Sequence, residues 1–261
     1  MLQSNGIIHQ TSADFHTLLK MPNIVTACDY AMSNQWLQQF AKNAIIPTNI
    51  LYNGNTRLGF YYQWLWQQLI IHHPDYSLIG EEIQLQWQQQ TVGAIDFLVH
   101  NRRSDEIEHW EVAIKFYLSF QHQWPGPNAN DNLDKKINRM IDHQLQLTDH
   151  PAFKLFTDHQ PTQRRLIMQG RLFDAWPNPQ SGSDMPINPI CLKGHWCYCS
   201  QATALELKVL EKRQWIAPPL FSQLITFLNI AEIKVPTQAL DSNNQVWFIV
   251  PDHWPRHNQQ P

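Results

Sequence analysis

Three ionisable side chains stand in two neighbouring apolar runs of the sequence. The run from Val92 to Val99 contains Asp96, and the run from His109 to Leu118 contains Glu111 and Lys115. Side chains of an extended chain alternate between two faces, so each run can present its ionic residues on one face. The polar segment between the runs favours an antiparallel hairpin, with Asp96 opposite or diagonal to Glu111. Two carboxylates and an ammonium group on a half-buried sheet are costly unless they bind something or neutralise one another.

This set of residues suits the hydrolysis of a phosphodiester. Asp96 and Glu111 offer the oxygen ligands that Mg²⁺ or Mn²⁺ prefers, and Lys115 could orient a water molecule or stabilise developing charge. The alternative is that the three residues form a cross-strand ionic network that only fixes the register of the hairpin. Glu81 and Glu82 of the preceding segment could add a ligand, although we expect them to be solvated edge residues.

The segments around these residues have clear periodicities. Apolar residues at helical spacing predict a helix from Leu58, which the His72 to Pro74 segment ends. Alternation predicts a strand over residues 76–87, before the hairpin. After the hairpin and a Pro-Gly-Pro turn, residues 132–147 predict a second helix. Beyond it we expect strands at 164–173, 191–199 and 244–250 and helices at 204–215 and 221–230.

The order of helix, three strands, helix and strand predicts an α/β or α+β fold, with a mixed sheet flanked by helices. A helical lead-in precedes this core, and a segment rich in Pro, Ser and Asn follows it. The expected domains are an N-terminal helical region at 1–57, a core at 58–175, a loop at 176–190 and a C-terminal α+β extension, packed on the core, at 191–261.

Sequence blocks add a resemblance to known proteins. LGFYYQWLW, TVGAIDFLV, HWEVAIKFYL, WPGPN followed by LDKKINRMIDHQL, LKGHW and QWIAP resemble, in this order, the blocks of an uncharacterised bacterial family, domain of unknown function 1853. The aspartate strand followed by the glutamate and lysine strand also resembles the PD-(D/E)XK restriction-endonuclease superfamily. That resemblance implies a restriction-endonuclease-like fold and a nuclease that uses Mg²⁺ or Mn²⁺. Its catalytic residues would be Asp96, Glu111 and Lys115, with the two acids as metal ligands.

The chain departs from the superfamily pattern at several positions. The second acid of the pattern lies two residues before the lysine, where this chain has Ala113. Glu111 lies two residues further back, which displaces it by about 7 Å at roughly 3.3 Å per residue. The resemblance to the family also implies acids at two positions where this chain has Gln63 and Ala94. Fewer anionic ligands predict weaker Mg²⁺ binding.

A second function follows from the same fold without catalysis. A net charge of -3 gives no global attraction to nucleic acid, so any phosphate binding must be local. Lys135, Lys136 and Arg139 of the second predicted helix are the candidate nucleic-acid-binding residues. The alternative is therefore a non-catalytic member of the fold that binds nucleic acid or a protein partner.

Composition and motifs exclude several other classes. With 43% hydrophobic and 16% charged residues the chain is typical of a globular protein. It lacks HExxH, GxSxG, Walker and GxGxxG motifs, which argues against the usual metalloprotease, esterase, NTPase and dehydrogenase classes. The chain start lacks the pattern of a secretion signal and no apolar run could span a bilayer, so we expect a cytoplasmic protein.

The histidines and cysteines give no strong metal signal. The 13 histidines are scattered, His109 and His122 flank a predicted strand, and we expect most of the histidines at the surface. Cys191, Cys197 and Cys199 lie with His195 in one short segment, and Cys28 is isolated. We expect reduced, inert thiols rather than a zinc site, because zinc knuckles use a CxxC turn rather than CxC in a strand.

Overall fold

The computed structural model describes residues 2–26, 29–180 and 182–255, so Cys28 lies outside the described residues. Within these ranges the strands form an eight-stranded mixed sheet in the order β1-β2-β3-β4-β5-β8-β7-β6. The chain divides into two compact units, unit 1 with residues 1–114 and 137–169 and unit 2 with residues 115–136 and 170–261. The expected mixed α/β architecture is confirmed. The expected domain boundaries at residues 57, 175 and 190 stay a prediction.

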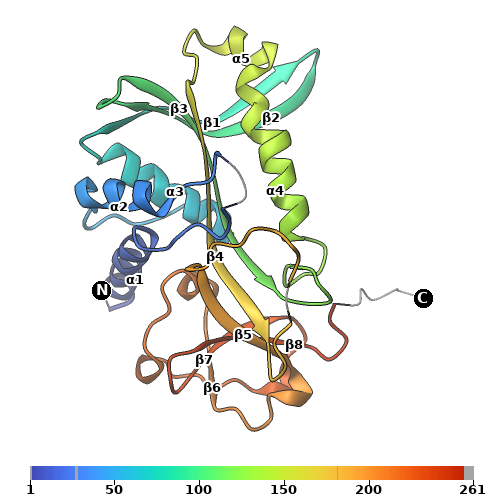
Figure 1. Cartoon of the computed structure of the whole chain (residues 1–261). Coiled ribbons are helices and arrows are strands. Elements are labelled where there is room, and N and C mark those ends of the chain that lie inside the picture. The colour runs from blue at the N-terminus through green and yellow to red at the C-terminus, as the bar shows by residue number, and fades with distance from the viewer. Residues whose placement is uncertain (1, 27–28, 181, 256–261) are drawn as a thin grey trace. The chain divides into compact units, whose positions relative to one another are not determined.

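Three elements are divided between the two units, because each of the three unit boundaries falls within a strand or helix. They are β3 (Glu106–Leu118), α4 (Leu133–Asp142) and β4 (Gln163–Ala175). The other elements of unit 1 are α1 (Leu2–Leu18), α2 (Asn34–Asn43), α3 (Leu58–Ile71), β1 (Tyr76–Trp87), β2 (Gln90–Asn101), the 3-10 helix η1 (Gln144–Asp149) and α5 (Pro151–Phe156) (Figure 1).

The expected hairpin of β2 and β3 is present. The two strands are antiparallel, and their paired positions run from Phe97 with Trp110 to Asn101 with Glu106. β1 pairs with β2 on the other side, also antiparallel. The order of α3, β1, β2, β3, α4 and β4 along the chain is therefore the one that the periodicities predict.

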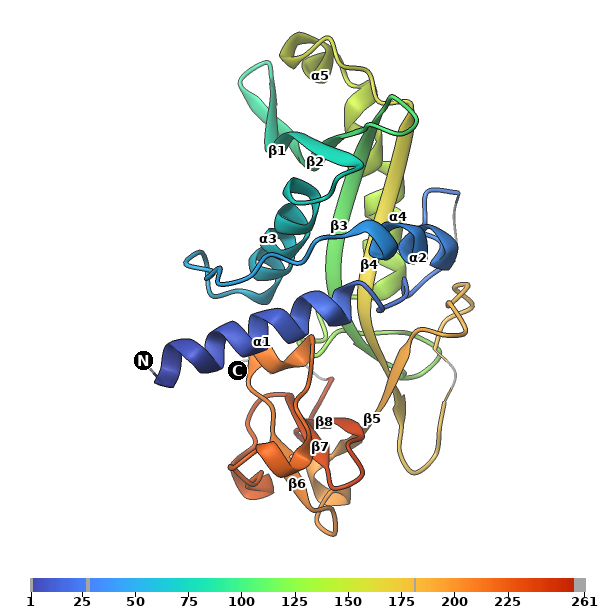
Figure 2. The same ribbon diagram turned by 90° about the vertical axis from the view of Figure 1, so that its left-hand side faces the viewer.

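Unit 1 packs side chains on both faces of β3. Trp110 is fully buried and meets the ring of Trp66 from α3 at a centroid distance of 6.2 Å and that of Trp36 from α2 at 5.2 Å. A second cluster joins Leu98 of β2 to Leu147 of η1 and Phe153 of α5. Figures 1 and 2 show α2 and α3 on one side of β3, and α4 on the other. The strand residues that alternate along β3 therefore face two different environments.

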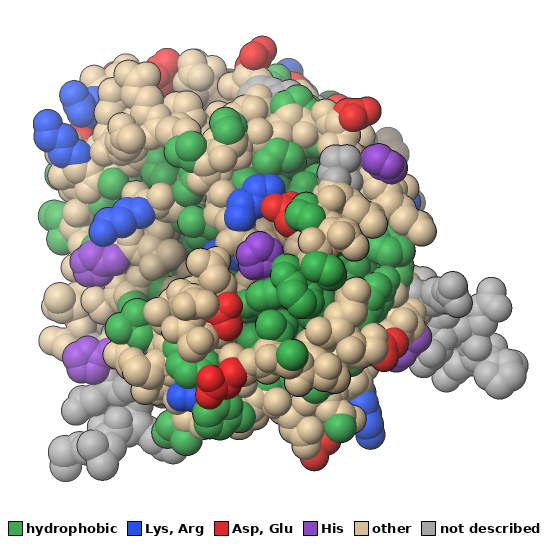
Figure 3. All heavy atoms as spheres, turned by 60° about the horizontal axis from the view of Figure 1, so that its bottom comes forward, with side chains coloured by type: hydrophobic (Ala, Val, Ile, Leu, Met, Phe, Trp, Pro, Cys, Tyr) green, Lys and Arg blue, Asp and Glu red, His purple; other side chains and the backbone are tan. Residues whose placement is uncertain are grey.

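Unit 2 is built on the C-terminal strands. β5 (Leu192–Tyr198) pairs in parallel with β8 (Val246–Val250), and β7 (Thr237–Asp241) joins β8 to β6 (Leu207–Val209) through antiparallel pairs. Its 3-10 helices are η2 (Cys199–Gln201), η3 (Lys212–Trp215), η4 (Phe221–Gln223) and η5 (Ile230–Glu232). The space-filling view of the side on which β5 to β8 lie shows apolar side chains gathered among polar ones (Figure 3). The most exposed large apolar side chains of unit 2 are Ile190, Leu220, Ile225, Phe227 and Val235.

The expected helices at 204–215 and 221–230 are wrong. Residues 207–209 form β6, because they pair with β7 and because the backbone of Val209 bonds to Thr226 and that of Leu207 to Leu228. Only short 3-10 turns at 212–215 and 221–223 remain of the expected helices. In the described part of the chain, no helix is long and apolar enough to cross a membrane.

Candidate functional site

Asp96 and Glu111 lie where the regular pairing of β2 and β3 gives way to side-chain hydrogen bonds. Next to the Phe97–Trp110 pair, the backbone N–H of Asp96 donates to Oε1 of Glu111 at 3.3 Å. The backbone N–H of Val112 donates to Oδ2 of Asp96 at 2.9 Å. Each carboxylate therefore accepts a backbone hydrogen bond from the strand that carries the other. The alternation of the two runs correctly predicts that these two acids face each other.

Glu111 is more deeply buried than the sequence predicts. Its side chain has no exposed area, and Nε2 of His109 lies 2.9 Å from Oε1. The side-chain amide of Gln144, the first residue of η1, donates to Oε2 at 2.8 Å. When Glu111 is ionised its carboxylate can only accept hydrogen bonds, and a neutral His109 ring then carries its proton on Nε2. The surroundings of Glu111 thus supply donors to both oxygens.

His109 is neutral at physiological pH. Burial lowers its pKa from 6.5 to about 4, because the charged imidazolium would lose its hydration. The carboxylate of Asp96 opposes that shift, and the guanidinium of Arg164 adds to it. His109 is thus one of the histidines that do not lie at the surface. The period-two alternation of β3 was the missed signal, since it places His109 on the same face as Glu111.

Lys115 lies four residues beyond Glu111 on β3 and belongs to unit 2. Its ammonium group forms an ion pair with Oδ2 of Asp131 at 2.6 Å, and the two side chains are 26% and 33% exposed. The hydroxyl of Tyr117 donates to the same carboxylate oxygen at 3.2 Å. Sequence analysis did not anticipate Asp131 as the partner of the lysine, since its position before α4 suggests only a helix cap.

Asp96 and Glu111 supply only two of the charged oxygen ligands that a hard cation such as Mg²⁺ takes. Among residues 2–26, 29–180 and 182–255, no group of three or more His, Cys, Asp or Glu side chains is placed to hold a metal. Each of the two carboxylates accepts a backbone hydrogen bond from the other strand, and Mg²⁺ or Mn²⁺ would need further amide or backbone carbonyl oxygens and water to complete its ligand set. Gln63, Ala94 and Ala113 carry no charge. A site on this chain would therefore depend on oxygen ligands that carry no charge.

The model of the family described as domain of unknown function (DUF1853) matches residues 1–250. The chain belongs to this family. No curated protein and no solved structure is significantly similar to it. The roles of Asp96, Glu111 and Lys115 in this member of the DUF1853 family thus have to be argued from its own geometry.

The basic residues of α4 in this family member point to solvent to different extents. Lys135 and Arg139 are exposed, and Lys136 is half-buried. Lys135 and Arg139 are four residues apart, so they lie on the same side of the helix. Ile137 and Met140 occupy the buried side. The role of Lys135, Lys136 and Arg139 in nucleic-acid binding stays a prediction.

Glu81 and Glu82 are exposed, as expected for edge residues. They line an open pocket of about 270 Å³ together with Gln63 and Trp64 of α3. The amide of Gln67 donates a hydrogen bond to Glu81.

The three described cysteines have thiols that stay protonated. Cys191 and Cys197 are buried, and Cys199 is half-buried. Burial raises the pKa of Cys197 to about 12 and also raises those of Cys191 and Cys199. His195 packs its ring against that of Trp247 at a centroid distance of 5.0 Å.

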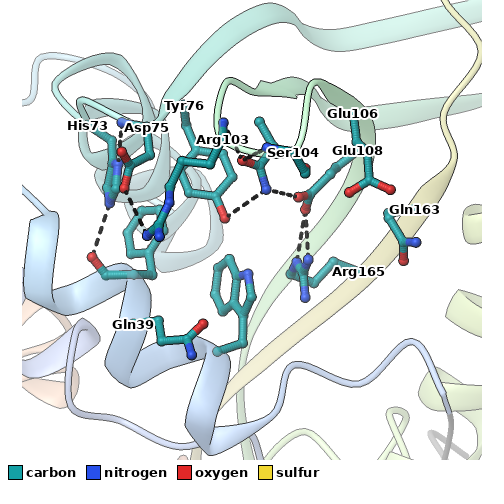
Figure 4. A pocket seen from close by; sticks show the side chains of 13 residues that line it. Gln39, His73, Asp75, Tyr76, Arg103, Ser104, Glu106, Glu108, Gln163 and Arg165 are labelled. Atoms are coloured by element: carbon teal, nitrogen blue, oxygen red, sulfur yellow. Dashed lines mark hydrogen bonds and ion pairs between the residues drawn. The ribbon is translucent and has the colours of Figure 1, made fainter.

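A polar pocket of about 250 Å³ lies on the other face of the unit 1 sheet (Figure 4). Its most buried acid is Glu108, whose side chain is 1% exposed. Nε and Nη2 of Arg165 both donate to Oε2 of Glu108, at 3.1 and 2.8 Å. Asn101 and Trp110 donate to the same carboxylate. Sequence analysis missed this ion pair, because its partners come from β3 and β4, which are distant in sequence.

Trp36 on the wall of this pocket has its ring occupied by neighbours. The guanidinium of Arg165 lies 4.3 Å from its ring centroid. The ring of Phe40 stacks on it with a centroid distance of 5.2 Å. The pocket therefore combines a neutralised ion pair with aromatic rings that already pack on one another. These contacts stabilise unit 1.

Proposed function

We propose that this protein is a divergent metal-dependent nuclease, in which Asp96 and Glu111 hold Mg²⁺ or Mn²⁺ and Lys115 assists phosphodiester hydrolysis. The observation that carries the proposal is the reciprocal hydrogen bonding of the two acids at the point where β2 and β3 stop pairing regularly. The order of α3, three strands, α4 and β4 supports a restriction-endonuclease-like fold for the core.

Each residue of the proposed site would have a separate role in catalysis. When bound, the cation supplies charge neutralisation at the scissile phosphate and lowers the pKa of a bound water. Asp96, which is half-buried, and Glu111 orient the cation through their carboxylate oxygens. His109 donates to Glu111 and so fixes the orientation of that carboxylate. Lys115 keeps an accessible ammonium group that would stabilise negative charge on the phosphate, in competition with Asp131.

Calorimetric titration with Mn²⁺ tests the metal site. The native chain should bind Mn²⁺, and Asp96→Ala and Glu111→Ala should each weaken binding at least tenfold. Glu82→Gln is the matched control, because it removes an exposed carboxylate of the neighbouring strand β1. If the native chain and both alanine variants give the same null titration, the metal site does not exist.

Cleavage assays test the chemistry. With Mn²⁺ present, single-stranded and double-stranded DNA and RNA should be incubated with the native chain and with Lys115→Ala. The proposal expects cleavage of at least one substrate by the native chain and its loss in Lys115→Ala, with Mn²⁺ affinity unchanged. Cleavage at equal rates by both chains would remove Lys115 from the mechanism.

The second candidate is a non-catalytic member of the fold that binds nucleic acid or a protein. It is favoured by the complete burial of Glu111 and by the donors that already occupy both of its oxygens. Lys135, Lys136 and Arg139 would then contact phosphates, and affinity for nucleic acid should fall steeply with salt. Unchanged affinity after Lys135→Gln and Arg139→Gln would exclude that surface.

A further inference from the structure

We infer that this protein pairs with a second copy of itself through one edge of the unit 2 sheet, at residues 225–228. These residues belong to unit 2 alone, and the pairing does not depend on the proposed metal site of Asp96 and Glu111. Backbone groups that point outward, exposed apolar side chains and the absence of charged residues along the segment support it.

Residues 226–228 extend the unit 2 sheet beyond β6. The backbone N–H of Val209 donates to the carbonyl of Thr226 at 3.0 Å. The backbone N–H of Leu228 donates to the carbonyl of Leu207 at 2.8 Å. β6 pairs with β7 on its other side. Among the segments that the structure describes, 226–228 is therefore the outermost one at this edge of the sheet.

Phe227 lies between these two hydrogen bonds, opposite Lys208 of β6. In an antiparallel ladder such a position is a non-hydrogen-bonded pair, so each of the two residues directs its own N–H and C=O away from the other. The backbone groups of Lys208 face β7, whereas those of Phe227 face away from the sheet. No residue that the structure describes forms a backbone hydrogen bond with Phe227. Phe227 thus presents one donor and one acceptor, side by side, that the protein itself does not use.

The side chains along this edge do not protect it. Ile225 and Phe227 are 90% and 56% exposed, and they share a face because they are two positions apart in an extended segment. Sheet edges are usually protected by charged side chains, especially Lys, but residues 214–231 contain no Asp, Glu, Lys or Arg. Nζ of Lys208 lies 4.3 Å from the ring centroid of Phe221 and donates to the carbonyl of that residue, so its charge is not directed to the edge.

A second copy is the partner that matches these backbone groups. In a hydrogen-bonded antiparallel pair, two opposite residues exchange both of their N–H···O bonds. Phe227 of a second copy offers the same donor and acceptor, so a two-fold axis between the two residues would satisfy all four groups. The two rings would then be neighbours on one face of the joined sheet, with Ile225 diagonal to the ring of the other copy.

The charges favour the same partner. An uncharged segment would meet an uncharged segment, so no like charges would face each other although the chain carries a net charge of -3. A peptide with charged side chains would instead place them against Ile225 and Phe227, where they would lose hydration.

Analytical ultracentrifugation of the full chain tests the pairing. The average mass should rise from one chain to two as the concentration increases across the micromolar range. Ile225→Lys adds an ammonium group to a side chain that is already exposed, so the fold should be unaffected and the dimer dissociation constant should rise at least about tenfold. Leu155→Lys is the matched control, because it makes a similar change on a side chain of α5 in unit 1 that is 79% exposed. It should associate like the native chain.

Opposite charges at position 227 test the register. Phe227→Lys and Phe227→Glu each place like charges directly opposite one another across the two-fold axis, so each variant alone should be monomeric. An equimolar mixture of the two variants places opposite charges there and should associate more tightly than either variant alone. Both substitutions keep the backbone hydrogen bonds of residues 226 and 228 to β6.

Three results would contradict the pairing. A native chain that stays monomeric at every concentration overturns the inference. A native dimer that Ile225→Lys and both Phe227 variants leave as tight as before also overturns it, because that dimer would use another surface. If the mixture of the Phe227 variants associates no better than each variant alone, the antiparallel pairing centred on Phe227 is wrong.

Discussion

Asp96 and Glu111 are joined by two hydrogen bonds in which each carboxylate accepts a backbone N–H of the other's strand. The bonds occupy the position next to the Phe97–Trp110 pair. The same pair of acids thus continues the connection between β2 and β3 with side chains in place of backbone carbonyls. Replacement of either acid should therefore affect both the fold and any ligand, and variants must be chosen to separate the two effects.

Asp96→Asn should separate stability from metal binding. The asparagine oxygen can still accept from the N–H of Val112, so the free energy of unfolding should change by less than about 1 kcal/mol. Asp96→Ala leaves that N–H without its acceptor and should cost about 1–3 kcal/mol. Both variants remove the charge and should weaken Mn²⁺ binding. Urea denaturation and Mn²⁺ titration of the same samples measure the two effects. An equal loss of stability in both variants would contradict the role of the Val112 bond.

His109 should make stability depend on pH. Its pKa is about 4 in the fold and 6.5 in the unfolded chain, so between these values the unfolded chain binds more protons. Stability is therefore fully present above about pH 6.5 and falls as the pH drops towards about 4, by about 3 kcal/mol in all. His109→Gln keeps a donor for Glu111 and does not titrate, so it should flatten this part of the curve. Urea denaturation of both proteins across this pH range measures the free energy of unfolding. If its slope against pH is the same in His109→Gln as in the native chain, His109 is not the group responsible.

Arg165→Met should destabilise the protein strongly. The substitution leaves the buried carboxylate of Glu108 without its cation, which costs about 3–5 kcal/mol for a buried ion pair. Arg164→Met is the control, because its partner Asp149 is 65% exposed and a pair of that kind contributes about 1 kcal/mol or less. Denaturant unfolding gives the free energy of unfolding of both variants, so the two losses can be compared. Similar losses in both variants would show that burial of Glu108 does not govern the cost.

Gly170→Ala should prevent correct pairing of β3 and β4. Gly170 has φ of 142°, a conformation that other residues rarely adopt, and a Cβ there would meet the carbonyl oxygen of Lys115 at 1.7 Å. We expect a loss of at least about 3 kcal/mol. Gly59→Ala is the control, since a Cβ at that helical position meets nothing within 4 Å and should stabilise by about 0.5–1 kcal/mol. Thermal unfolding should show a lower melting temperature than that of the native chain for Gly170→Ala and a higher one for Gly59→Ala.

The sequence predicts unit 1 better than unit 2 for a physical reason. In β2 and β3 the hydrophobic alternation, the polar turn and the paired acids all favour the same hairpin, so the local and long-range preferences agree. Around Leu207 they disagree. Residues with high helix propensity surround it, but the strand pairing with β7 is formed instead. That pairing involves residues 30 to 34 positions away, which local periodicity cannot detect.

The candidate site is predictable only in part. Asp96 and Glu111 follow from the period of two. Gln144 does not, because the periodicity predicts a helix up to residue 147, whereas the helix ends at Asp142 and the chain continues as a 3-10 helix. The partner of Lys115 was also missed, since Asp131 comes from a loop that no periodicity describes. Acids on strands are visible in a sequence, but their hydrogen-bond partners depend on how the chain turns.

The chain passes between the two units at residues 114–115, 136–137 and 169–170, each time inside a strand or helix. No contiguous gene fragment encodes either unit, so neither can be obtained by trimming the protein from one end. A fragment ending at Ile114 would lack the second segment of unit 1 and would interrupt β3. Recombination in evolution faces the same restriction, because exchange of one unit for a foreign one would require several simultaneous crossovers. Neither unit can therefore be exchanged as a single contiguous segment.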